Sequence, residues 1–128
     1  MKASTFGVIM TALIGAAWCC AIADNAATYT DSQAAQGAKA YAQSCAECHG
    51  AKLQGVNAPA LSGSSFKGKQ TVGQIYTLMS AQMPLSAPGS LTPTAYAAIM
   101  AFILKENGHP AGGAPLQPST AKSITETI

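Results

Sequence analysis

The sequence predicts an all-α fold with three to four main helices. Three segments carry helix-forming patterns, and residues 50–68 between the first two are rich in Gly, Ser, Asn and Pro without the alternation of a strand. The 128 residues suffice for one small domain, and only 6% of them are aromatic. A core made mainly of small and aliphatic side chains is thin for this length. We therefore expect a group other than protein to fill part of the interior.

The chain begins with the pattern of an export signal. Residues 6–23 are almost continuously apolar, and Lys2 is the only charge ahead of them. Ala21 and Ala23 supply the small residues of a cleavage site. We expect residues 1–23 to be a signal peptide that is removed on export, which makes the protein periplasmic.

Two other interpretations of this segment stay open. The apolar run is close to the minimum length of a spanning helix, so it could be retained as a membrane anchor. A lipoprotein would use Cys19 or Cys20, but the bulky Trp18 stands where a small residue is expected. Residues 24–31 are then an N-terminal extension ahead of the first helix.

Charge excludes a nucleic-acid partner. Seven basic residues face five acidic ones, the net charge is +2, and no basic run occurs. Removal of Lys2 with the signal peptide lowers the net charge further.

The first helix is predicted over residues 32–44. Thr30 and Gln33 fit a capping box, and the Ala-rich sequence that follows has a high helix propensity. Gly37 is unfavourable in the middle of a helix, so we expect a second helix to cross closely there. Tyr41 lies four residues on and therefore on the same face.

Two further helices follow the Gly-rich loop. Apolar residues at helical spacing predict one over residues 71–81, which ends before Pro84. The other is predicted over residues 93–106, with Thr92 as its N-cap and Gly108 after its end. The remaining tail, residues 109–128, is expected on the surface, with its last ten residues poorly ordered.

Two cysteines and a histidine directly follow the first helix, in Cys45-Ala46-Glu47-Cys48-His49. Cys-x-x-Cys-His is the attachment motif of c-type haem. Two thiols on about one helical turn can add to the two vinyl groups of a porphyrin, and the next residue can bring its imidazole to the iron as the proximal ligand. One covalently bound haem c would also supply the apolar bulk that the core lacks.

Other uses of the cysteine pair are weaker. A structural zinc site needs four ligands, and His109 is the only other histidine in the chain. A redox-active pair is expected near a βαβ pattern, which the sequence lacks, and a simple structural disulfide gives His49 no role.

The second axial ligand decides the chemistry of the haem. The candidates are Met79, Met83, Met100 and His109. Met79 and Met100 occupy apolar positions of predicted helices, where Met is usually core filler, and His109 has the character of a surface residue. Met83 lies in an extended segment before Pro84, so we predict it as the distal ligand. Ligation by His and Met raises the reduction potential and leaves no open position for a substrate.

At this point the chain resembles a class I c-type cytochrome with one haem. The shared features are ordered along residues 32–108: Gly37, Tyr41, the Cys-x-x-Cys-His motif, Pro59-Ala60-Leu61, Met83-Pro84, and a last helix with Ile99 and Phe102. The resemblance implies the cytochrome c fold, in which three to four main helices surround the haem. It also implies that Gly37 and Tyr41 pack against Ile99 and Phe102 where the first and last helices cross.

The resemblance further implies two roles beside the motif. The backbone carbonyl of Pro59 would accept a hydrogen bond from the His49 ring and so fix its orientation and basicity. Leu61 would pack on the haem face.

A finer resemblance concerns the partners. Residues 58–63, 88–91 and 104–108 look like those of cytochromes that accompany PQQ-dependent dehydrogenases. This implies an electron carrier, not an enzyme, that accepts electrons from a quinoprotein dehydrogenase and passes them to a terminal oxidase or another cytochrome. Both a free carrier and a subunit of a dehydrogenase complex fit this role. The alternative is a haem c protein with a labile distal site, acting as a ligand-binding sensor or a redox enzyme subunit. Membrane contact is expected only if residues 1–23 are retained as an anchor.

The sequence departs from the family in one respect. Many class I cytochromes hold a haem propionate with Arg or Trp, and residues 24–128 contain neither. The candidate replacements are Tyr76, Lys67, Lys69, Ser and Asn side chains, and backbone amides. Because the net charge is small, we expect partners to dock on a largely apolar patch with little dependence on salt.

Overall fold

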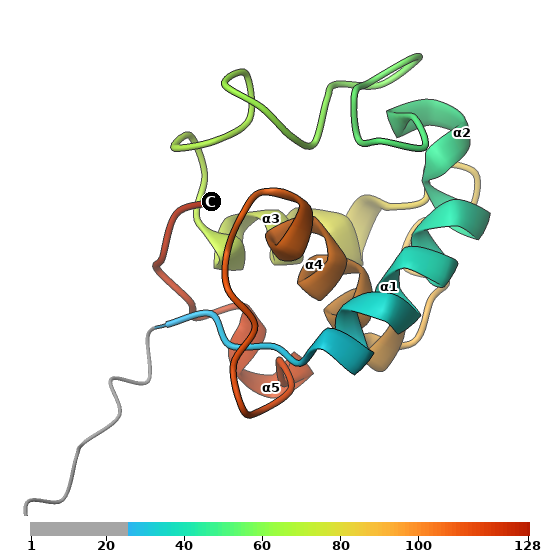
Figure 1. The fold of residues 1–128 in the computed structure, drawn as a ribbon. Helices are drawn as coiled ribbons and strands as arrows, with labels where there is room; N and C mark the ends of the chain where they lie inside the picture. Colours follow the sequence, from blue (N-terminus) through green and yellow to red (C-terminus); the bar gives the residue numbers. More distant parts are fainter. Residues whose placement is uncertain (1–25) are drawn as a thin grey trace, which may run out of the picture.

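The computed structural model describes residues 26–128, which form five helices and contain no β-strand (Figure 1). The export signal and its two alternatives fall on residues outside this range. The helices are α1 (Asp31–Ser44), α2 (Ala46–His49), α3 (Val72–Gln82), α4 (Pro93–Glu106) and α5 (Pro118–Ala121). The all-α prediction is therefore confirmed, and the three main helices have their predicted bounds to within one residue.

Helices α1 and α4 cross in close contact, as the mid-helix glycine predicts. Gly37 is buried against the backbone of α4, and a Cβ at position 37 would overlap the carbonyl group of Ala98. One turn further along, the rings of Tyr41 and Phe102 pack at 5.2 Å between centroids and an angle of 51°. This crossing fixes the direction of α1, and with it the position at which α2 begins.

The N-terminus of α1 differs from the prediction in one detail. Thr30 caps the helix by accepting a bond from the Gln33 amide at 3.1 Å, but the Gln33 side chain does not return to Thr30. It pairs instead with the backbone of Leu116, donating to the carbonyl at 2.9 Å and accepting from the amide at 2.8 Å. The predicted capping box is thus wrong, because the Leu116 backbone in the tail takes up the hydrogen bonds of the Gln33 side-chain amide.

Local chemistry sets the ends of α3 and α4. Thr71 and Gln74 form a full capping box at the start of α3, and Thr92 caps α4 by accepting from the Ala95 amide at 3.1 Å. After α4, Gly108 has a φ of 89°, and its amide bonds to the Lys105 carbonyl at 3.0 Å. A left-handed residue of this kind ends a helix and turns the chain away.

The C-terminal tail is ordered and contributes to the core, so the expectation of a loose surface tail is wrong. Leu116, Ala121, Ile124 and Ile128 are all buried. Near the start of α3, the Val72 amide donates to the Glu126 carbonyl at 2.9 Å, and the chain end lies beside the loop that enters α3 (Figure 1). We call residues 109–128 the C-terminal strap, because apolar residues spaced along this segment cover a side of the helices that would otherwise be exposed.

None of the helices in residues 26–128 is long and apolar enough to cross a membrane.

Candidate haem site

The attachment motif occupies a single helical turn. The Cys45 amide donates to the Tyr41 carbonyl at 2.8 Å as α1 ends, and the His49 amide donates to the Cys45 carbonyl at 2.9 Å. Cys45, Cys48 and His49 therefore lie on one turn directly after α1. Cys45 is half-buried and Cys48 is exposed, and both are free thiols.

Burial disfavours the thiolate form of Cys45. Burial raises the pKa of the Cys45 thiol to about 11. Redox-active Cys-x-x-Cys motifs instead stabilise a thiolate and lower the pKa of one cysteine. A neutral thiol beside the core suits a residue that becomes part of a thioether.

The His49 ring is held by a backbone carbonyl. Its Nδ1 lies 2.8 Å from the Pro59 oxygen, the contact that the sequence resemblance implies. When Nδ1–H donates to a carbonyl, Nε2 is left as the basic nitrogen, which is the form that ligates a metal. His49 is thus oriented to ligate a metal through Nε2.

The loop that carries Pro59 is tied to α2 by backbone hydrogen bonds. The Cys48 carbonyl lies 3.0 Å from each of three successive amides, those of Val56, Asn57 and Ala58. The His49 carbonyl accepts from the Gly55 amide at 2.7 Å. Motif and loop therefore form one unit, which keeps the distance between the His49 ring and its carbonyl partner fixed.

Hydrogen bonds to two separate segments hold the Leu61 backbone in place. Its amide donates to the Leu53 carbonyl at 2.8 Å, and its carbonyl accepts from the Asn107 side chain at 2.9 Å. Asn107 is buried at the end of α4 and also donates to the Ile103 carbonyl. Sequence reasoning missed this role of Asn107, and its position just before Gly108 signals only a helix end. The Leu61 side chain itself is half-buried against the core.

Met83 lies where α3 stops. Its backbone is extended, with φ −112° and ψ 153°, and its amide donates the last bond of the helix to the Met79 carbonyl at 3.0 Å. The peptide bond to Pro84 is cis. The side chain is half-buried and packs beside the core, and the carbonyl accepts from the Gly89 amide at 3.2 Å and from the Tyr96 hydroxyl at 2.6 Å. The thioether thus comes from a short segment with a fixed backbone.

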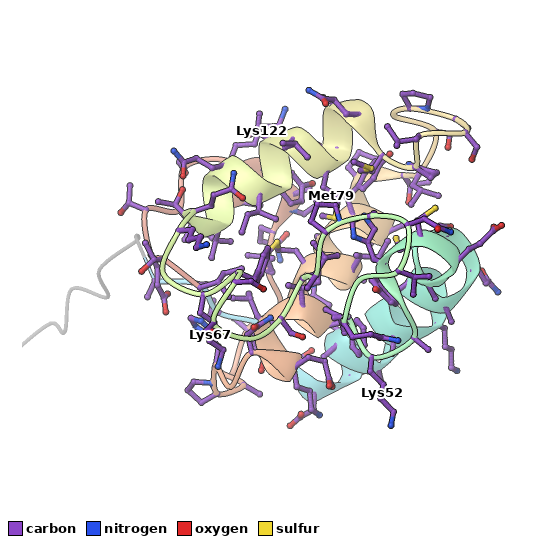
Figure 2. The ribbon with its side chains drawn as sticks, turned by 90° about the horizontal axis from the view of Figure 1, so that it is seen from above. Lys52, Lys67, Met79 and Lys122 are labelled. Atoms are coloured by element: carbon purple, nitrogen blue, oxygen red, sulfur yellow. The ribbon has the colours of Figure 1, made fainter. Side chains whose placement is uncertain are left out.

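The other candidate ligands are placed differently. Met79 and Met100 are buried residues of α3 and α4, and the label of Met79 falls near the middle of the molecule in Figure 2. His109 Nδ1 pairs with a Glu126 carboxylate oxygen at 3.1 Å in the tail. Tyr76, a candidate for the propionates, is buried and donates to the Pro93 carbonyl at 3.3 Å, whereas Lys67 and Lys69 are exposed.

These residues fit a covalently held haem. Two free thiols share one turn with an imidazole whose Nδ1 is already bonded, and half-buried apolar side chains adjoin the core nearby: Cys45, Ala46, Leu61, Met83 and Phe102. Residues 26–128 form helices and no strands, α1 and α4 cross closely, and the attachment turn follows α1. Together these features define a c-type cytochrome, whose general function is electron transfer.

The comparisons with known proteins agree. The family model described as "Cytochrome C oxidase, cbb3-type, subunit III" matches residues 32–103, more than half of the chain, and the chain belongs to this cytochrome c family. Membership implies a covalently bound haem c, with Cys45 and Cys48 as the two thiols of the motif. No curated protein matches the sequence.

A solved structure shares the fold. The "Crystal Structure of the Sulfane Dehydrogenase SoxCD from Paracoccus pantotrophus" contains a chain that matches with a TM-score of 0.57 and 24% sequence identity, covering 94% of this chain and 68% of the other. At this level of identity the match shows the fold alone.

Proposed function

We propose that the protein is an exported one-electron carrier in which His49 and Met83 are the axial ligands of its haem iron. The observation that carries the proposal is that hydrogen bonds hold both proposed ligand residues in place. The His49 ring lies 2.8 Å from the Pro59 carbonyl oxygen, and the Met83 carbonyl accepts two hydrogen bonds. When bound, the haem supplies an iron that gains or loses one electron, and its potential is raised by Met/His ligation.

The protein contributes rigidity around the ligands. Tyr41 donates to the Gly50 carbonyl at 2.8 Å, directly after His49, and the Cys48 carbonyl binds the neighbouring loop. A ligand set that does not move when the charge changes keeps the reorganisation on electron transfer small. Electron exchange then needs no proton and no vacant coordination position.

The partners proposed for this carrier are a quinoprotein dehydrogenase as donor and a terminal oxidase or another cytochrome as acceptor. The donor rests on residues 58–63, 88–91 and 104–108, which resemble those of dehydrogenase-linked cytochromes. The structure that shares the fold is that of a sulfane dehydrogenase, and the family description names an oxidase; both are compatible with the proposed path. A periplasmic location is part of this proposal and rests on the signal peptide predicted over residues 1–23.

Docking is proposed to be mainly apolar. Val56, in the loop bonded to Cys48, is 64% exposed, and Leu85, two residues after Met83, is 72% exposed. Lys52, Lys67 and Lys122 lie far apart around the molecule and do not form a single cluster (Figure 2). Brief encounters between redox proteins use small interfaces, which two exposed apolar side chains beside the haem ligands suit.

Ligand assignment is tested by the ferric spectrum of the haem-loaded protein. Sulfur ligation of ferric haem gives a weak absorption band at the red end of the spectrum. We expect Met83→Ala to abolish this band and Met79→Ala, the buried neighbour one turn earlier, to keep it. A band that persists in Met83→Ala would contradict the proposed ligand set. Its absence from the unaltered protein would favour the alternative of a labile distal site.

A further inference from the structure

Tyr96 closes the loop that carries Met83. Its hydroxyl donates to the Met83 carbonyl at 2.6 Å and accepts from the Leu91 amide at 3.4 Å. Residues 83–91 leave α3 and return to α4, so one hydroxyl joins the two ends of the segment. Of these two bonds, the one to Met83 is the short one.

Tyr96 is itself held firmly. It lies in the first turn of α4, just after the N-cap Thr92, and is 3% exposed. Its amide donates to the Thr92 carbonyl at 3.1 Å. Because α4 is the helix that packs on α1, the hydroxyl is a fixed point relative to the turn that bears His49.

We propose that Tyr96 is a positioning residue that keeps the Met83 thioether on the iron. The inference rests on the proposed function, in which Met83 is the distal ligand. For an outside ligand to replace the thioether, the Met83 side chain must move away, and its backbone is the part that the hydroxyl holds. Without the hydroxyl, the Met83 carbonyl keeps only the bond from Gly89 at 3.2 Å, and the Leu91 amide loses its partner.

The chain supplies a control in Tyr29. This tyrosine is also buried, at 1% exposure, and its hydroxyl donates to the backbone carbonyl of His109, after the end of α4. That bond lies outside the loop over residues 83–91. Removing the Tyr29 hydroxyl therefore costs a tyrosine hydrogen bond away from Met83, whereas removing the Tyr96 hydroxyl costs its bonds to Met83 and Leu91.

The experiment measures ligand exchange in the haem-loaded protein. Imidazole binding to the ferric form and carbon monoxide binding to the ferrous form are followed in the unaltered protein, Tyr96→Phe, Tyr29→Phe and Met83→Ala. We expect Tyr96→Phe to bind imidazole about tenfold more tightly than the unaltered protein, since one buried hydrogen bond no longer opposes the movement of Met83. Tyr29→Phe should bind it as the unaltered protein does.

Global stability is measured on the same samples by denaturant unfolding. If both tyrosine variants lose similar stability and only Tyr96→Phe gains ligand access, the effect belongs to the Met83 loop. Equal imidazole affinity in Tyr96→Phe and Tyr29→Phe, with the sulfur–iron band abolished in Met83→Ala, would overturn the role of Tyr96 alone. A band that survives in Met83→Ala would instead overturn the ligand assignment on which the inference rests.

Discussion

Gly37 lies directly against the backbone of Ala98, and no side chain separates α1 from α4 at this point. The contact is between the hydrogen-bearing Cα of one helix and the carbonyl group of the other. A closest approach of this kind fixes the position of both helices at once. It therefore determines where α1 ends, and with it where Cys45 begins the attachment turn.

A methyl group at position 37 should destabilise the protein. In Gly37→Ala the new Cβ would overlap the Ala98 carbonyl, and backbone atoms cannot move aside as a flexible side chain can. Overpacking of about 3 kcal/mol exceeds the gain of about 1 kcal/mol that Ala brings to a helix, so the free energy of unfolding should fall by about 2 kcal/mol. Denaturant unfolding of the haem-loaded protein measures this loss.

Gln36→Ala is the control for that substitution. Gln36 is the exposed neighbour of Gly37 in α1, so the change alters helix propensity without touching α4. Its stability should match the unaltered protein or rise slightly. A Gly37→Ala protein as stable as Gln36→Ala would show that the two helices are not in close contact.

Stability should fall at alkaline pH through Tyr41. Burial raises the pKa of Tyr41 from 10.0 to about 12. Between these values the unfolded chain releases the phenol proton while the folded protein keeps it, so rising pH favours the unfolded state. Below pH 10 this contribution to stability is fully present, and it is lost progressively by about pH 12.

Tyr41→Phe tests this dependence. At neutral pH the variant should lose about 1 kcal/mol, because the hydrogen bond to the Gly50 carbonyl is gone. Above pH 10 its free energy of unfolding should decline less steeply than that of the unaltered protein. Parallel stability curves over the alkaline range would mean that Tyr41 ionises equally well in the folded protein.

The C-terminal strap should contribute measurably to stability. Ile124 is buried, and its carbonyl accepts from the Gly73 amide at 3.0 Å. Ile124→Ala should lower the free energy of unfolding by about 3 kcal/mol through lost burial and the cavity left behind. Thr125→Ala, at the exposed next position, should have little effect. Equal stabilities of the two variants would indicate a tail that does not pack.

Electron exchange between ferrous and ferric copies of the protein should depend little on salt. With a small net charge and Leu85 exposed beside Met83, we expect the self-exchange rate to change less than about twofold between low and physiological ionic strength. Leu85→Lys should slow the exchange at low salt, because two like charges then meet at the contact. Added salt should make the exchange of this variant faster. Nuclear magnetic resonance line widths report this rate.

Ala35→Lys is the matched control, because it adds the same charge at an exposed position of α1. It should leave the self-exchange rate near that of the unaltered protein. A steep salt dependence in the unaltered protein, or equal slowing in both lysine variants, would rule out docking at the Leu85 surface.

The helices were predictable because their signals are local. Thr92 and Gly108 mark the two ends of α4 through capping, which involves only neighbouring residues. The periodic apolar positions of α3 are visible directly in the sequence. The close crossing at Gly37 was also predictable, since a glycine in a helix interior is costly without a packing reason. The hydrogen bond between His49 and Pro59 was expected only through the resemblance to a family.

What escaped prediction depends on contacts between distant segments. The Gln33 side chain prefers the Leu116 backbone to its own helix, although 83 residues separate them. The tail was expected to be loose because its composition is weakly polar, yet Ile124 and Ile128 find apolar partners in the core. The bond from Tyr96 to Met83 has no sequence signal, because a helical tyrosine at an apolar position is usually only core.

Carbon monoxide binding to the native ferrous protein tests the central claim most directly, because only a closed site with both axial ligands retained excludes this small ligand. Rapid mixing of the haem-loaded, reduced protein with carbon monoxide is followed by the change in its absorption spectrum. With His49 and Met83 both on the iron, binding should be slow and incomplete, while Met83→Ala should bind rapidly under the same conditions. Rapid, complete binding by the unaltered protein would contradict the account and indicate an open site suited to ligand sensing or catalysis.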